Sequence, residues 1–535
     1  MIEQEYLWWQ KEILYQIYPR SFKDSNDDGI GDLPGILQKL DYLQELGIKG
    51  VWISPFYPSP MADFGYDVSD YIGVHPMFGT IEDFDNLLKE IHNRDMKLIL
   101  DFVPNHTSNE HPWFQESIKS RDDPKREWYI WKDPGPDGGP PNNWGAAFGG
   151  SGWEYDDSTG QYYYHAFLKE QPDLNWRNPE VQEAMFNAMR FWLDKGVDGF
   201  RVDVMWHMIK DDQFRDNPIN PDYTEDKSPY DKYIQAYNTD QPEVHEIVKK
   251  MRNVMDEYDE RVMIGEIYLP IDKLVTYYGE DNEGTHLPFN FLLVVLPWDA
   301  RKIEAAVNEY EGSLPPDGWP NWVLGNHDNS RMATRVGKEQ ARIAAMLLLT
   351  LRGTPTMYYG DEIGMEDVEI SADEVMDPQE KNIPGKGLGR DPERTPMQWD
   401  DSPNAGFSSA KPWLPIMENY QKINVANELE NDNSTLNFYK KLIKLRNNEP
   451  ALQVGNFIPV PSEENIFSFI REYAGKKFLI ALNFGSSEEK CEPGLKDWKG
   501  KVKLATHPQK QGEEIKNLVY LGPHQGVILE IIDNQ

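Results

Sequence analysis

The sequence has little cysteine, little positive charge and no long apolar run, and each shortage excludes a class of protein. Cys491 is the only cysteine in 535 residues, which excludes an intramolecular disulfide or a cysteine-rich metal site and is typical of a reducing compartment. No apolar run is long enough for a transmembrane helix, and acidic residues interrupt the first twenty positions where a signal peptide would be apolar. We therefore expect a cytoplasmic protein without a membrane partner.

The shortage of positive charge argues against a nucleic-acid partner. The chain has 54 Lys and Arg against 90 Asp and Glu, a formal net charge of −36. Affinity for phosphate backbones and anionic membranes comes from clustered cations, so both surfaces would repel this chain. We interpret the acidity as a solvated surface that favours solubility, with salt adaptation as the alternative. The 39% of hydrophobic residues indicate a globular protein with a large core.

Short β-branched and aromatic runs alternate with longer segments of helical period, the pattern of βα units. The expected strands are 13–18, 50–54, 97–103, 199–203, 262–266, 289–293, 322–326 and 356–360. The expected helices are 35–47, 80–94, 179–195, 243–257, 271–278, 301–310, 338–351 and 435–447. Strands that are each followed by a helix favour an α/β fold with a closed (β/α)8 TIM barrel over an open doubly wound sheet.

Long insertions interrupt the barrel pattern and define the expected domains. The segments 204–242 and 361–434 are two of these insertions, and all of them emerge on the face where such barrels carry active sites. The third insertion, residues 105–176, is too long to lack structure, so we expect it to form a small inserted B subdomain. After about residue 450 the alternation becomes that of an antiparallel β domain. The predicted domains are the barrel at 1–104 and 177–449, the B subdomain at 105–176 and the C-terminal β-sandwich at 450–535.

Several polar residues come directly after apolar strands, and a barrel brings all such positions to one mouth. Any single one could be a structural residue that satisfies loop backbone groups. Acids, histidines and an arginine at four separate strand ends are better explained by catalysis. These residues are Asn105, His106, Arg201, Asp203, Glu266, His327 and Asp328.

This set contains three carboxylates, and the sequence shows neither a nucleophilic serine in a strand-to-helix turn nor a pair of histidines that would bind a metal. These residues therefore point to the cleavage of a glycosidic bond. Asp203 is the expected nucleophile, because Arg201 lies two residues away on the same strand face and favours its ionised form. Glu266 is the expected acid, because its apolar sequence neighbours raise a carboxyl pKa. Asp328 would stabilise positive charge that develops on the sugar ring.

The segments that carry these residues resemble the signature regions of a known family. DFVPNH, GFRVD, VMIGE and NHDN are similar, in order and spacing, to the four regions of glycoside hydrolase family 13, the α-amylase family. QPDLNW at 171–176 and RTPMQW at 394–399 resemble its α-glucosidase and oligo-1,6-glucosidase branch. The resemblance implies a catalytic barrel with B and C domains, a retaining mechanism, and the same roles for Asp203, Glu266 and Asp328.

The resemblance also implies residues that bind the transferred glucose. His106, Arg201 and His327 would hold its hydroxyls, and Tyr66 would stack beneath its ring.

The same resemblance implies the walls of that pocket. Phe148 and Phe167 would form aromatic walls, although from the residues alone both read as core side chains. Asp63 and Arg394 would pair at its closed end and grip the outer hydroxyls. A pocket closed in this way implies an enzyme that acts from chain ends.

The segment DSNDDGIGD carries a candidate metal site. Asp24, Asn26, Asp28 and Asp32 have the alternate spacing that lets oxygen ligands surround a hard cation. Gly35 stands where an EF-hand needs a glutamate, so the loop is not an EF-hand. The pattern alone leaves two alternatives, a turn without a metal and a cation site. The family resemblance implies structural Ca²⁺, with the Ile30 carbonyl as a further ligand.

The residues leave the linkage preference open. Within the branch, a valine after the nucleophile, here Val204, resembles enzymes that prefer α-1,6 bonds, but the segment that follows differs from theirs. Trp206 and His207 either shape the leaving-group side or pack the insertion.

The leading hypothesis is an exo-acting retaining α-glucosidase of short oligosaccharides or other small α-glucosides, able to transfer glucose to sugars as well as to water. The first alternative is an oligo-1,6-glucosidase, and a sucrose- or trehalose-type glucosyl isomerase or transferase follows it. The RLDRD-type loop of sucrose isomerases is absent. A transporter-associated heavy chain is disfavoured, because such chains carry a membrane anchor and lack the catalytic set. We expect a monomer or homodimer.

Overall fold

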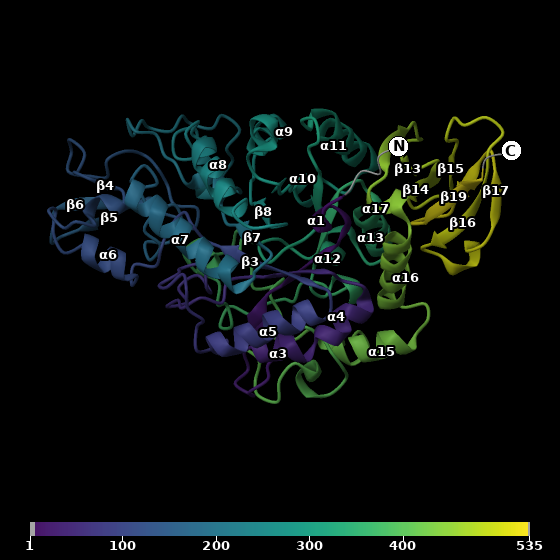
Figure 1. Cartoon of the computed structure of the whole chain (residues 1–535), viewed down its shortest axis with the longest axis horizontal. Helices are drawn as coiled ribbons and strands as arrows, with labels where there is room; N and C mark the ends of the chain where they lie inside the picture. Colours follow the sequence, from purple (N-terminus) through teal and green to yellow (C-terminus); the bar gives the residue numbers. More distant parts are fainter. Residues whose placement is uncertain (1–5, 533–535) are drawn as a thin grey trace.

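The computed structural model describes residues 6–532 and has a parallel barrel sheet at its centre (Figure 1). Its eight strands follow the order β10-β11-β1-β2-β3-β7-β8-β9, and each neighbouring pair is parallel. The strands are β1 Leu14–Ile17, β2 Gly50–Ile53, β3 Lys97–Phe102, β7 Gly199–Val202, β8 Val262–Gly265, β9 Leu287–Pro288, β10 Asn321–Val323 and β11 Thr354–Tyr358. The predicted (β/α)8 fold is confirmed.

The barrel closes between β9 and β10 through a side chain instead of a backbone ladder. Asn321, which is fully buried, donates from Nδ2 to the carbonyl of Pro288 and accepts the backbone N–H of Asn290 at 3.0 Å. Pro288 has no N–H to offer to a strand pair, so the amide of Asn321 satisfies backbone groups that a ladder would otherwise pair.

The predicted sixth strand, 289–293, is wrong in position. The strand is β9, two residues earlier, and Leu292–Val295 form the short helix α10. The side chain of Asn290 accepts the N–H of Leu292 at 3.0 Å, which starts a turn where the apolar sequence read as a strand. Phe289 and Phe291 are buried, as they would also be in a strand, so hydrophobicity alone cannot distinguish the two structures here.

Helices surround the sheet and follow the predicted order. They are α3 Leu33–Gln38, α4 Leu40–Leu46, α5 Ile81–Asn93, α7 Pro179–Lys195, α8 Val244–Met255, α9 Ile271–Leu274, α11 Ala300–Ser313, α13 Ala341–Thr350 and α16 Thr435–Asn448. Capping residues set several ends. In α7, Asn178 accepts the N–H of Glu180 at the start, and Gly196 ends the helix at φ 105°.

Residues 105–176 form a small aromatic lobe beside the barrel. It contains α6 Pro112–Ser117 and a three-stranded sheet of β4 Trp131–Lys132, β5 Trp153–Asp156 and β6 Gln161–Tyr164, in the order β4-β6-β5. Trp144, Trp153 and Tyr164 make its core. In Figure 1 this lobe and the C-terminal sheet lie at opposite ends of the molecule's long axis.

The C-terminal region is antiparallel. Its main sheet has the order β12-β13-β14-β19-β16-β17, and β15 pairs with β18. The strands are β12 Asn456–Val460, β13 Ile466–Tyr473, β14 Lys476–Asn483, β15 Glu489–Cys491, β16 Lys499–Ala505, β17 Glu514–Lys516, β18 Val519–Leu521 and β19 Gly526–Ile532. The buried Arg471 of β13 joins this region to the barrel by donating to the carbonyl of Thr350, at the end of α13.

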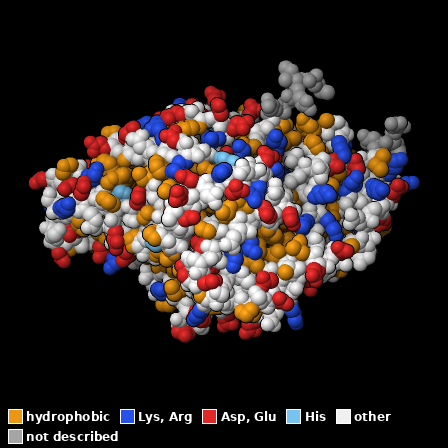
Figure 2. Space-filling model, turned by 60° about the horizontal axis from the view of Figure 1, so that its bottom comes forward, with side chains coloured by type: hydrophobic (Ala, Val, Ile, Leu, Met, Phe, Trp, Pro, Cys, Tyr) orange, Lys and Arg blue, Asp and Glu red, His pale blue; other side chains and the backbone are white. Residues whose placement is uncertain are grey.

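The distribution of acidic side chains fits the expected solvated surface. On the face in Figure 2, acidic side chains are scattered over the molecule instead of gathering in one patch. Within residues 6–532, no helix is long and apolar enough to cross a membrane. Cys491 is buried as a free thiol. The predicted domain ranges extend over residues 1–5 and 533–535, which lie outside the described residues.

Candidate active site

A pocket of about 300 Å³ opens where the barrel strands end, between the barrel and the 105–176 lobe. Ten of the residues proposed from the sequence line it, namely Asp63, Tyr66, His106, Phe148, Phe167, Asp203, Val204, Glu266, His327 and Asp328. Arg201 and Arg394 lie behind this wall, both fully buried. The strand ends therefore bring together side chains from segments far apart in the sequence, as a barrel mouth requires.

Arg201 connects the two expected catalytic carboxylates. It lies in β7, and its Nη1 is 2.9 Å from Asp203 Oδ1 while its Nη2 is 2.5 Å from Glu266 Oε2. The backbone N–H of Val204 also reaches Oε2 of Glu266, at 3.0 Å. Asp203 and Glu266 also share a side-chain hydrogen bond, so the two carboxyls interact directly as well as through Arg201.

A third carboxylate, Asp101, shares the same guanidinium and was missed by the sequence analysis. Its Oδ1 lies 2.7 Å from Nη1 of Arg201, and both side chains are fully buried. Asp101 sits in the apolar run LILDFV of β3, and a charge inside a buried strand was the signal that could have found it. Arg201 therefore serves three carboxylates, not Asp203 alone.

Burial and charge set the protonation of this cluster. Burial raises the pKa of Glu266, and it also raises the pKa of Asp203 well above its ordinary value although Arg201 opposes this. Burial raises the pKa of Asp101 to about 6. One guanidinium cannot neutralise three buried carboxylates, so we infer that the group retains a proton near neutral pH. The pKa directions do not separate the acid from the nucleophile, because burial outweighs Arg201 at Asp203 and raises its pKa as well as that of Glu266.

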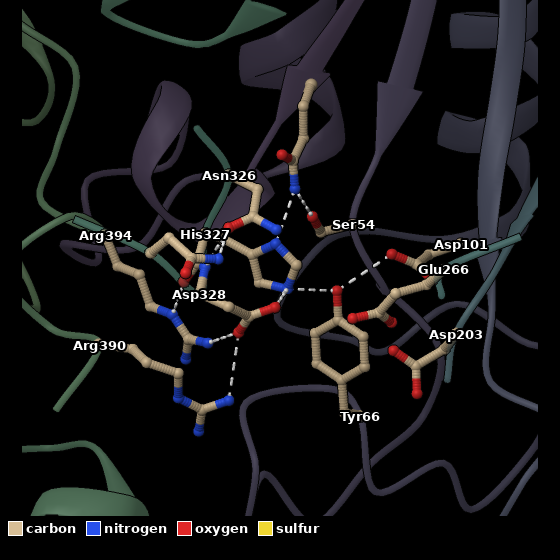
Figure 3. A network of polar contacts seen from close by, with 12 residues as sticks. Ser54, Tyr66, Asp101, Asp203, Glu266, Asn326, His327, Asp328, Arg390 and Arg394 are labelled. Atoms are coloured by element: carbon tan, nitrogen blue, oxygen red, sulfur yellow. Dashed lines mark hydrogen bonds and ion pairs between the residues drawn. The ribbon is translucent and has the colours of Figure 1, made fainter. Parts of the chain in front are cut away.

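His327 joins a chain of hydrogen bonds that reaches the same cluster (Figure 3). Gln16 Nε2 lies 2.8 Å from Nδ1 of His327, so Nδ1 accepts and Nε2 carries the hydrogen. Nε2 lies 2.6 Å from the Tyr66 hydroxyl, which donates to Asp101 Oδ2 at 3.0 Å. Burial lowers the pKa of His327 well below its ordinary value, which keeps the ring neutral.

The expected pair of Asp63 and Arg394 is wrong, because a different arginine pairs with Asp63. Arg390 places Nη2 2.8 Å from Asp63 Oδ1 and 2.6 Å from Asp377 Oδ1, and its Nη1 is 3.3 Å from Asp328 Oδ1. Arg390 also lines the pocket and lies over the ring of Phe148, 4.6 Å from its centroid. The ion pair in this pocket wall is therefore that of Asp63 and Arg390.

Arg394 instead supports Asp328 from behind. Its Nη2 lies 2.8 Å from Asp328 Oδ1, and its Nε donates to the carbonyl of His327 at 2.6 Å. Burial disfavours the charged form of Asp328, but His327, Arg394 and Arg390 together lower its pKa below the ordinary value. Asp328 therefore stays ionised, as a stabiliser of positive charge must be.

The rest of the wall comes from the lobe and from the insertions. Phe148 and Phe167 stand edge to face with centroids 5.6 Å apart, and His106 lies against Phe167 at 5.3 Å. Gln171, missed from the sequence, donates to Asp63 Oδ2 at 3.1 Å. Further lining residues from the insertions and loops are Trp206, His207, Tyr230, Tyr268, Asn329 and Gln379.

The backbone bends sharply directly after Asp203. Val204 has φ 34° and ψ 47°, a left-handed conformation that is an outlier for a β-branched residue. The bend points the Val204 N–H at Glu266 and starts the short 3₁₀ turn η2, Met205–His207, which places Trp206 and His207 on the pocket wall. Strain of this kind is typical of functional sites.

The candidate calcium loop is arranged as a hydrogen-bonded turn. Asp24 accepts three backbone N–H groups of the loop at 2.8 to 2.9 Å and the hydroxyl of Ser408 at 2.6 Å. Asp32 caps helix α3 through Gly35 N at 2.6 Å. These bonds occupy the acceptor positions that a carboxylate offers at Asp24.

The other proposed ligands continue the same turn. Asn26 accepts the N–H of Asp28 at 3.0 Å, and Asp28 accepts that of Ile30 at 2.8 Å. Within residues 6–532, no group of three or more His, Cys, Asp or Glu side chains is placed to hold a metal. Calcium binding at this loop stays a prediction.

Comparison with known proteins identifies the family of this chain. Residues 16–455 match the family model for the α-amylase catalytic domain. The α-glucosidase of Apis mellifera is 44% identical over 89% of this chain and 85% of its own length. The oligo-1,6-glucosidase of Heyndrickxia coagulans is 40% identical over 92% of this chain and 95% of its own length.

Solved structures agree with these relatives. The α-glucosyl transfer enzyme XgtA has a TM-score of 0.93 at 38% identity, over 98% of this chain and all of that one. A trehalulose synthase mutant in complex with Tris has a TM-score of 0.90 at 35% identity, over 98% of this chain and all of that one. The chain therefore belongs to the α-amylase family of glycoside hydrolases, in the branch that contains α-glucosidases and oligo-1,6-glucosidases.

Proposed function

We propose that the protein is an exo-acting, retaining α-glucosidase that removes terminal non-reducing glucose from short α-linked oligosaccharides and other small α-glucosides. The observation that carries this proposal is the position of Asp203 and Glu266, two buried carboxylates bridged by Arg201 on one pocket wall. The pocket has the Asp63–Arg390 pair at one end. A pocket with a closed end accepts a chain terminus, whereas an open cleft accepts the middle of a chain.

The geometry supports a double displacement. Asp203 Oδ2 attacks the anomeric carbon while Glu266 donates its proton to the glycosidic oxygen, so the C–O bond breaks and a glucosyl ester forms on Asp203. Glu266, now ionised, then takes a proton from water as that water attacks the ester. The product keeps the α configuration, and both carboxyls return to their starting states.

The surroundings of the two carboxyls support the charged transition state. The ionised Asp328 faces the pocket and stabilises the oxocarbenium-like ring. The neutral imidazoles of His106 and His327 line the pocket beside the ring of Tyr66, where a glucose ring would contact them. The glucosyl ester can also be discharged to a sugar hydroxyl, which makes glucosyl transfer a side reaction of the same site.

Two alternative activities share this catalytic set. An oligo-1,6-glucosidase is favoured by Val204 after the nucleophile and by relatives of that name at 40% identity. A glucosyl isomerase is supported only by structural neighbours such as the trehalulose synthase at 35% identity. We retain α-glucosidase as the leading proposal.

Initial rates and product identities on maltose, isomaltose, sucrose and trehalose test the proposal. Free glucose as the main product from maltose supports it. A preference for isomaltose of at least tenfold in kcat/KM would favour the oligo-1,6-glucosidase. Conversion of sucrose into an isomeric disaccharide, with little free glucose, would favour the isomerase.

The remaining expectations are part of the same proposal. We propose a cytoplasmic monomer or homodimer with structural Ca²⁺ in the loop at residues 24–32. The single cysteine, buried and unpaired, supports the reducing compartment. Size-exclusion chromatography with light scattering would determine the oligomeric state.

A further inference from the structure

A buried lysine ties three distant segments together directly behind the pocket. Lys210 lies in the insertion after β7, seven residues beyond Asp203, and only 2% of it is exposed. Its Nζ forms an ion pair with the fully buried Asp173, from the lobe, and donates to Oδ1 of Asn105 at 2.7 Å. The catalytic steps described above use neither Lys210 nor Asp173.

The ion pair determines which way the amide of Asn105 faces. A lysine ammonium only donates hydrogen bonds, so the atom of Asn105 that faces Lys210 must be the acceptor, Oδ1. Nδ2 of Asn105 then faces Asp173 Oδ2 at 2.8 Å, and a carboxylate is a matching acceptor. Both charges of the pair therefore favour the same orientation of the amide.

The orientation of Asn105 in turn determines the tautomer of His106. Nδ2 of Asn105 lies 3.1 Å from Nδ1 of His106, so Nδ1 must accept and the hydrogen must be on Nε2. Nε2 lies 3.0 Å from the carbonyl of Tyr66, which accepts this hydrogen. Gln171 Nε2, 3.3 Å from that carbonyl and 3.1 Å from Nε2, is directed at the same acceptor.

Charge and burial keep His106 neutral. Burial lowers the pKa of His106 to about 4, and the Lys210 charge acts in the same direction while Asp173 opposes it. Asp173 is itself held by the N–H of Ala166 at 2.7 Å, so the pair cannot move without the lobe. The neutral His106 therefore has a single N–H, on Nε2, and the carbonyl of Tyr66 accepts it.

We propose that the Lys210–Asp173 ion pair is a positioning device, which acts through Asn105 to hold His106 as the neutral Nε2–H tautomer, whose hydrogen bond to the carbonyl of Tyr66 fixes both pocket residues in place. The effect of the pair on turnover rests on the proposed glucosidase function. The tautomer itself is independent of any substrate. Lys210 and Asp173 touch neither substrate nor the reacting atoms, so they are positioning residues.

The double variant Lys210→Met/Asp173→Asn distinguishes a positioning role of the ion pair from a purely stabilising one. It removes both charges together, so neither partner is left as an unpaired buried ion. The amide that replaces the Asp173 carboxylate can still accept the Ala166 N–H through its oxygen, and its nitrogen then faces Asn105. A donor at that place favours the flipped amide of Asn105, which presents Oδ1 to His106 and draws the hydrogen to Nδ1.

The direct measurement is ¹⁵N NMR of protein labelled at histidine, without substrate, with the His106 signals assigned through a His106→Gln variant. In the wild type we expect the Nε2–H pattern, and in the double variant the Nδ1–H pattern or a mixture. Retention of the wild-type pattern in the double variant would overturn the proposal.

Kinetics with p-nitrophenyl α-glucoside give the second measurement. We expect kcat/KM of the double variant to fall at least tenfold while its Tm stays above that of Lys210→Met, which leaves Asp173 buried and unpaired. Recovery of both Tm and kcat/KM to wild-type values would show a purely structural pair and overturn the proposal. The matched control is Lys119→Met at an exposed position of the lobe, where no change is expected. If the wild type hydrolysed no α-glucoside, the proposed function would fail while the NMR test remained valid.

Discussion

The pair of Asp63 and Arg390 gives the most specific prediction about the shape of the substrate. Arg390→Met keeps much of the side-chain volume but removes the cation 2.8 Å from Asp63 and 2.6 Å from Asp377. Burial already raises the pKa of Asp63, with Arg390 as the main opposing charge. Without that charge the pKa of Asp63 rises further, and the protonated form accepts glucose hydroxyls less well than a carboxylate.

The magnitude follows from the contacts that are lost. A hydrogen bond to a charged group contributes about 1.5–3 kcal/mol, and about 1.4 kcal/mol is a factor of ten in affinity. We therefore expect the KM for maltose to rise by about 10- to 150-fold. Breaking a buried ion pair on one side costs about 3–5 kcal/mol of stability, so the Tm should fall as well.

Steady-state kinetics on maltose, with Tm measured in parallel, test this prediction, and Arg394→Met is the matched comparison. Arg394 lies 2.8 Å from Asp328 and leaves the Asp63–Arg390 pair intact, so its loss should lower kcat more than it raises KM. If Arg390→Met left KM within about twofold of wild type while Arg394→Met raised it tenfold, our assignment of the pair would be refuted.

Two further predictions concern catalysis and the metal. Asp203→Asn and Glu266→Gln should each retain less than about a hundredth of the wild-type kcat with an unchanged circular dichroism spectrum. Because burial raises the pKa of Glu266, the alkaline limb of kcat/KM should lie above the ordinary range of a glutamate and disappear in Glu266→Gln; more than a tenth of wild-type kcat in either variant would remove that role. Excess chelator should lower the Tm if calcium binds at residues 24–32, whereas an unchanged Tm together with no metal in elemental analysis would remove the calcium prediction.

The barrel and its catalytic carboxyls were predictable because they depend on local pattern. Asp203 and Glu266 directly follow apolar strands, and parallel strands bring their ends to one edge whatever the loops do. Asp101 was overlooked because it lies inside such a run. Its charge is tolerated there because Arg201 of the next strand pairs with it and the Tyr66 hydroxyl donates to it.

The closed end of the pocket was not predictable in the same way. Arg390 and Arg394 are four residues apart in an insertion without helical or strand period, so sequence spacing cannot tell which one reaches Asp63. The choice is made by tertiary contacts, with Asp377 holding Arg390 and the His327 carbonyl holding Arg394. The contacts of Lys210 could not be predicted for the same reason, since its partners Asn105 and Asp173 come from other segments of the sequence.

The central claim is that the enzyme releases single glucose units from the non-reducing end and keeps their configuration. ¹H NMR of maltotetraose hydrolysis in its first minutes tests both parts, because the anomeric signals of glucose and maltotriose are resolved before mutarotation. A retaining enzyme that acts from the non-reducing end gives α-glucose and maltotriose as the first products. Early β-glucose would show inversion, and early maltose without glucose would show an open cleft that cuts inside the chain.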